Sequence, residues 1–136
     1  MTEIKRISFS ELKNWSECPY RHKLVYVDKL PYFSGNEFTA FGTAIHTVCE
    51  LTVPGKSDKP LEVFEKAFLQ ELEILKESGH ELNKELVTDM RNQARPICEQ
   101  VIPAVKDHIG EFEVVSVEEQ LLEPMDDIES YGRKFK

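Results

Sequence analysis

Cysteine is too scarce and too scattered in this chain to build a disulfide framework. The three cysteines, Cys18, Cys49 and Cys98, are odd in number, and no Cys-x-x-Cys pair occurs. Disulfide-stapled domains need paired cysteines and an oxidising compartment, so this pattern favours a reducing, intracellular setting. A structural zinc site is not expected either, because it takes four clustered Cys or His ligands.

Long apolar runs are also missing. No stretch approaches the roughly 18 residues needed to cross a bilayer, and residues 1–6 lack the apolar core of a secretory signal. The sequence contains no internal repeats and no low-complexity segments. We therefore expect a soluble cytoplasmic protein that does not bind membranes. Its 136 residues, 40% of them hydrophobic, suit a single domain over residues 1–136.

The net positive charge common among nucleic-acid binders is absent, since the formal net charge is −8. The charge is uneven, however. Residues 1–48 contain six Lys and Arg against five Asp and Glu, whereas residues 49–136 contain eleven against twenty. Any nucleic-acid surface is therefore expected in the N-terminal third. There, Tyr20, Arg21 and Lys23 can stack on a base and pair with phosphates, although solvated cations beside core aromatics are commoner.

Helix signals dominate the sequence up to residue 109. A capping box precedes a short helix whose apolar face holds Leu12 and Trp15, and Pro19 suits the first position of a second helix. A third helix is expected to begin at residue 37 or 42 and to end at residue 52. These form a first region of helices over residues 1–53.

Apolar residues at helical spacing predict a second helical region over residues 61–109. Pro96 and Pro103 fall inside it, and each would cost about 3 kcal/mol in an unbroken helix, so we expect a break or kink. After Gly110 the hydrophobic period changes to two, which predicts a strand with one face formed by Val115, Val117, Glu119 and Leu121.

These patterns together predict an α+β fold. An N-terminal helical region is followed, over residues 112–136, by the first strands of a small mixed sheet that is incomplete where the sequence stops.

The segment Phe41–Glu50 carries the chemistry of greatest interest. Helical spacing places His46 and Glu50 four residues apart on one face, and an imidazole beside a carboxylate suits a divalent cation. The competing interpretation is a half-buried histidine that hydrogen-bonds Glu50 or a backbone carbonyl. Glu119 is the odd residue on its apolar strand face. It is either solvated at a sheet edge or held by a cation or a base.

Two segments of the chain also form a pattern together. They are Ser8–Leu12 followed by Cys18-Pro19-Tyr20, and Phe41–His46 followed by Glu50. Their order and spacing resemble the opening of the RecB-like branch of the PD-(D/E)XK nucleases, which includes the RecB and AddB nuclease domains and the CRISPR-adaptation exonucleases. The resemblance is close over residues 7–51 and only architectural over residues 61–122. It implies the N-terminal part of an α/β nuclease-like fold and a metal-dependent DNA exonuclease that hydrolyses phosphodiester bonds.

The resemblance also implies roles for individual residues. In that family the histidine matching His46 binds metal, and a glutamate on the strand before the catalytic hairpin resembles Glu119. The acid matching Glu50 is a neighbour whose role varies in the family, and we expect Glu50 to support the metal ligands without binding the metal itself. We therefore expect Mg²⁺ or Mn²⁺ at His46 and Glu119, with Tyr20, Arg21 and Lys23 contacting single-stranded DNA or duplex ends.

The family pattern is incomplete downstream. Its metal-binding Asp and its (D/E)-x-Lys pair lie on the next strands, but after Glu119 no acid precedes Lys134 or Lys136 at the required offset. Iron–sulfur members of the family add three C-terminal cysteines to one near Cys18, so no iron–sulfur cluster is expected. We expect the chain to bind metal weakly and to cut little or nothing by itself. It would be truncated, decayed, or split with a second chain that completes the sheet.

Two other functions remain open. The chain could be a non-catalytic module that binds DNA or protein, or a small helical adaptor or inhibitor from a mobile element in which the motifs are coincidental.

Overall fold

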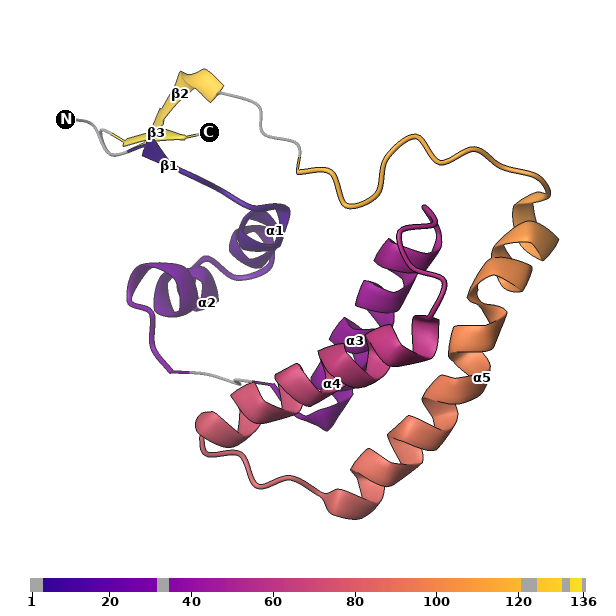
Figure 1. Ribbon diagram of the computed structural model, residues 1–136. Helices are drawn as coiled ribbons and strands as arrows, with labels where there is room; N and C mark the ends of the chain where they lie inside the picture. The colour runs from indigo at the N-terminus through magenta and orange to yellow at the C-terminus, as the bar shows by residue number, and fades with distance from the viewer. Residues whose placement is uncertain (1–3, 32–34, 121–124, 131–132, 136) are drawn as a thin grey trace. The chain divides into compact units, whose positions relative to one another are not determined.

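The computed structural model describes residues 4–31, 35–120, 125–130 and 133–135. The chain forms two compact units, which we describe separately (Figure 1). The terminal unit comprises residues 1–33 and 120–136, and the helical unit comprises residues 34–119. The expected single domain over residues 1–136 stays a prediction.

The terminal unit combines short helices with short strands. Its helices are α1 (Phe9–Glu17), α2 (Pro19–His22) and the π-helix η1 (Lys23–Val27). Its strands are β1 (Ile4–Lys5), β2 (Met125–Ser130) and β3 (Arg133–Phe135), in the order β1-β3-β2. Strand β3 pairs parallel with β1 and antiparallel with β2, so these strands join the two ends of the chain (Figure 1).

Caps begin the first helices at the predicted places. The backbone N–H of Glu11 donates to Ser8 Oγ over 3.1 Å at the start of α1. Pro19 occupies the first turn of α2, where its missing N–H has no intrahelical partner to lose. These local signals act within a few residues, which explains why the sequence alone locates both helix starts.

The helical unit consists of α3 (Glu37–Thr52), α4 (Pro60–Glu77) and α5 (Lys84–Ile109). Helix α3 packs against α4, and α5 contacts both. Small residues at every fourth position of α3 allow the aromatic rings of α4 to approach closely, and the rings of Phe64 and Phe68 stack with centroids 5.1 Å apart. The buried core residues are Ala40, Ala44, Val48, Phe64, Phe68, Leu72, Leu75, Met90, Ala94, Cys98 and Val101.

Helix α3 begins at the earlier of its two predicted starts. Asn36 caps it, and the side chains of Asn36 and Thr39 each accept from the other residue's backbone N–H, over 3.1 and 2.9 Å. Gly42 therefore lies inside the helix. Because the first helical residue, Glu37, stands five residues before Gly42, the Gly-Thr pair is not the helix start.

Helix α5 runs without a break through Pro96 and Pro103, so the predicted break is wrong, and a kink at either proline stays a prediction. Both prolines lie on the exposed side of the helix. The opposite side contributes Ala94, Cys98 and Val101 to the core. Core packing along this face holds the two proline-containing turns in one helix despite the missing backbone donors.

The predicted α+β fold class is wrong. Helices make up most of the regular structure in the described residues, and residues 111–119, where the first strand was expected, form no strand. Val115 is 96% exposed, so the expected apolar face is not packed. An alternating sequence becomes a strand only when a neighbouring strand takes its hydrogen bonds. Leu121 and the other residues 121–124, 131–132 and 136 of the predicted sheet lie outside the described residues.

None of the helices in the described part of the chain is both long and apolar enough to cross a membrane.

Candidate metal and nucleic-acid site

His46 meets an acid from a distant part of the sequence. The residue lies on α3, and its Nε2 atom is 2.8 Å from Oε1 of Glu118. Both side chains are 55% exposed. This contact is open to solvent, and a ligand can therefore reach it.

Glu118 has an unusual backbone conformation. Its φ angle is +49°, in the left-handed region that residues other than glycine seldom adopt. Such a conformation costs on the order of 1–3 kcal/mol and persists only where the surroundings hold it. The contact with His46 is one such restraint, and it turns the Glu118 carboxylate toward α3.

The structure brings His46 together with Glu118, the neighbour of the predicted ligand Glu119. Glu119 is exposed and follows Glu118 in the segment without a strand. The alternating pattern had placed Glu118 on the opposite face, and that assignment fails because no strand forms. The only sequence signal for Glu118 was its position beside a second acid. Glu50 lies one turn after His46 and is half-buried.

The exposed pair differs from the other His–Glu pairs of the described residues. His22 Nε2 lies 2.9 Å from the buried Glu11, and His80 Nε2 lies 3.0 Å from the buried Glu37. In those pairs the carboxylate is enclosed by protein, which suits a structural role. In the His46–Glu118 pair, by contrast, both side chains are largely exposed to solvent.

The His46–Glu118 pair fits part of a divalent-cation site. Its 2.8 Å separation is close to the about 3 Å between adjacent ligand atoms of an octahedral ion with bonds of about 2.1 Å. The described residues contain no group of three or more His, Cys, Asp or Glu suited to a metal. The two residues therefore supply one nitrogen and one oxygen, and the remaining positions would fall to water, substrate or other groups.

The predicted nucleic-acid residues lie on α2 and η1. Tyr20 is 69% exposed. Arg21 Nε donates to Asn14 over 2.7 Å, and its Nη2 pairs with Glu17. Lys23 pairs with Asp28 over 2.7 Å, and this hydrogen bond raises the pKa of Lys23. Both cations are therefore partly neutralised by acids of their own unit.

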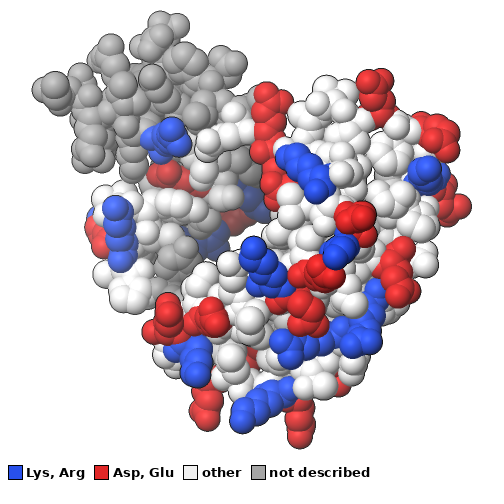
Figure 2. Space-filling view, viewed as in Figure 1, with Lys and Arg blue, Asp and Glu red and all other residues white. Residues whose placement is uncertain are grey.

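The helical unit shows no continuous basic patch on the face in Figure 2. Lys and Arg side chains alternate there with Asp and Glu. Sequence-independent binding of nucleic acid needs clustered cations along a groove. The viewed face of the helical unit does not offer such a groove.

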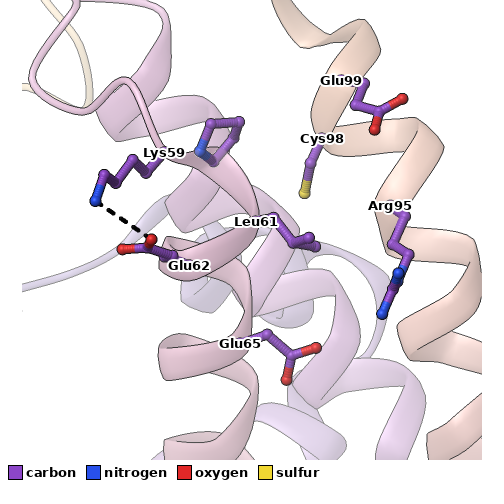
Figure 3. Close-up of a pocket in the computed structure, with 8 residues that line it drawn as sticks. Lys59, Leu61, Glu62, Glu65, Arg95, Cys98 and Glu99 are labelled. Carbon is purple, nitrogen blue, oxygen red and sulfur yellow. Dashed lines mark ion pairs between the residues drawn. The ribbon is translucent and has the colours of Figure 1, made fainter.

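A cavity of about 570 Å³ lies between the start of α4 and the middle of α5 (Figure 3). Cys98 and Arg95 project into it from α5, and Lys59 pairs with Glu62 at its edge over 3.3 Å. Burial raises the pKa of the Cys98 thiol, which keeps it protonated and unreactive. None of the predicted site residues lines this cavity.

The chain matches the family model of the PD-(D/E)XK nuclease superfamily over residues 6–131. No curated protein and no solved structure matches it. PD-(D/E)XK nucleases generally use divalent metals, and their substrates are nucleic acids. The match covers almost the whole chain and confirms the superfamily that the two motif segments predict. The RecB-like branch stays a prediction. The chain belongs to the PD-(D/E)XK nuclease superfamily.

Proposed function

We propose that this chain is part of a RecB-like, metal-dependent DNA exonuclease, and that it contributes His46 and Glu118 to the metal site. The observation that carries the proposal is the solvent-facing contact between these two residues, 2.8 Å apart, in a chain of the PD-(D/E)XK superfamily. An imidazole nitrogen and a carboxylate oxygen are both ligands for Mn²⁺ and Mg²⁺.

Each residue has a distinct role in this proposal. His46 must present an unprotonated Nε2 to a metal, so a bound metal would replace the direct contact between Nε2 and Glu118. Glu118 supplies the negative charge, and Glu50, one turn further along α3, would support the ligands without binding the metal itself. A bound divalent ion would polarise the scissile phosphate. The family's (D/E)-x-Lys pair does not follow Glu119 in this sequence, so the chain alone should cut little.

Paired variants of the neighbouring acids test the assignment. We expect Glu118→Gln to weaken Mn²⁺ binding about ten-fold or more, because the variant removes the negative charge of a proposed ligand. The matched control Glu119→Gln should leave affinity within about two-fold, and His46→Ala should lose binding. Isothermal titration calorimetry measures all three. A larger loss for Glu119→Gln would restore the prediction from sequence, and unchanged binding in His46→Ala would reject the metal site.

A nuclease assay tests the activity. With Mn²⁺ and an end-labelled single strand, the chain alone should show little cleavage. Rapid cleavage would contradict our account of the missing carboxylates.

A non-catalytic DNA-binding module is the second candidate, favoured by the lack of a three-ligand cluster in the described residues. In that case the protein shifts single-stranded DNA at low salt without metal, and His46→Ala binds equally well.

A further inference from the structure

Helix α1 exposes its apolar residues and buries an acid. Phe9 is 81% exposed, Leu12 51% and Trp15 53%, whereas Glu11 is 7% exposed. An amphipathic helix normally turns its apolar stripe inward. A buried acid and an exposed apolar stripe on the same helix are both informative departures from that pattern.

The orientation of α1 is held by specific contacts. Glu11 Oε1 lies 2.9 Å from His22 Nε2, and the His22 ring stacks on Tyr26 with centroids 5.3 Å apart. Breaking a hydrogen bond to a buried carboxylate is costly, so α1 cannot rotate to bury its aromatic rings without losing this contact. The exposed stripe, formed by Phe9, Leu12 and Trp15, is therefore a maintained feature, and we call it the aromatic face.

Lys13 lies beside the aromatic face, within a locally cationic segment. At about 100° per residue, Lys13 lies about 40° around α1 from Phe9. Arg21 lies further around the helix, because it donates a 2.7 Å hydrogen bond to Asn14, about 140° from Phe9. Residues 4–31 contain six Lys and Arg against three Asp and Glu, in a chain of net charge −8. This surface thus joins exposed rings to a locally positive charge.

We propose that the aromatic face of α1, extended by Tyr20 of α2, binds single-stranded nucleic acid by stacking unpaired bases on its rings. Aromatic platforms bordered by cations bind single strands in this way, because every base has a stackable face and every linkage carries a phosphate. A duplex hides its base faces, so it should bind less well. The inference rests on the proposed function, which makes a DNA strand the substrate.

Glu17 reduces the positive charge near this surface. Its carboxylate pairs with Arg21 and lies 3.9 Å from Lys13, so one acid partly neutralises both cations. A phosphate must compete with Glu17 for them. Removing this one charge should strengthen binding, an effect that damage to the fold does not produce.

Trp15 provides the measurement, because it is the single tryptophan of the chain. Titrating the full chain with an oligothymidylate of about 15 nucleotides, in EDTA and low salt, should quench Trp15 fluorescence as bases stack. Phe9→Ala should weaken the affinity about ten-fold, the equivalent of one lost stacking contact. Glu17→Gln should tighten it several-fold. Phe38→Ala is the matched control, since Phe38 is 64% exposed on the helical unit.

Three outcomes would overturn the proposal: no quenching, an equal loss in Phe38→Ala, or self-association of the protein that Phe9→Ala abolishes, which would make the face a protein interface. Circular dichroism checks that the variants fold. Because the titration contains no metal, its result is separable from the metal test. Oligothymidylate binding without Mn²⁺ binding rejects the metal site alone, and Mn²⁺ binding without oligothymidylate binding rejects the aromatic face alone.

Discussion

At the scale of single residues, Gly42 lacks a side chain and leaves open space on the surface of α3 near His46. Gly42 lies one helical turn before His46, on the same face of α3. Apart from its chain neighbours and the backbone of its own helix, a Cβ added there would meet no atom within 4 Å. The glycine therefore answers no packing requirement in the described structure, and it weakens the helix that carries the proposed ligand.

Gly42→Ala should stabilise the protein by about 1 kcal/mol, since alanine is the better helix former and the site is open. Gly35→Ala is the contrasting variant. Gly35 has φ +107°, and its added Cβ would lie 2.9 Å from Thr39 Oγ1, so we expect destabilisation of about 1 kcal/mol or more. Urea unfolding measures both. A destabilising Gly42→Ala would show that an unseen neighbour occupies this space.

At the scale of elements, one buried acid joins the start of α3 to the start of α5. The backbone N–H of Asn83 donates to Glu37 over 2.7 Å, and His80 lies 3.0 Å from the same carboxylate. Asn83 in turn caps α5. The Asn83 hydrogen bond, with the help of His80, lowers the pKa of Glu37 below its ordinary value of 4.5.

This contact predicts an acid-sensitive junction. A carboxylate whose pKa is lower in the folded than in the unfolded state adds stability above pH 4.5, and that stability is lost as the pH falls through the folded pKa. Glu37→Gln should cost about 1–2 kcal/mol at pH 7 and less at pH 3, below the ordinary carboxyl pKa. Urea midpoints at both values measure this, with the exposed Glu81→Gln as control. An equal cost at both pH values would contradict the assignment.

At the scale of the whole molecule, the proposed chemistry is divided between the two units. The helical unit contains both His46 and Glu118, near opposite ends of its sequence. The terminal unit contains the aromatic face. A metal held by His46 and Glu118 would therefore tie residues 111–119 to α3 and favour the folded helical unit.

Metal should accordingly raise thermal stability. At about ten times its dissociation constant, Mn²⁺ should add about 1.4 kcal/mol, and EDTA should remove this gain. Differential scanning calorimetry measures it. His46→Ala should abolish the shift, whereas an unchanged shift in that variant would place the metal elsewhere.

Some features of this protein follow from local sequence signals, and others arise only from tertiary contacts. Helix caps, hydrophobic spacing and the two motif segments depend on nearby residues, so the sequence by itself determined the main helices, the superfamily and His46 as the candidate ligand. Glu118 lies 72 residues from His46, and only the folded chain brings the two together. The inverted orientation of α1 and the missing strand after residue 110 were likewise decided by tertiary structure. A buried acid needs a hydrogen-bond partner, and a strand needs a neighbouring strand to take its backbone hydrogen bonds. Both come from other parts of the chain, so no local pattern predicts them.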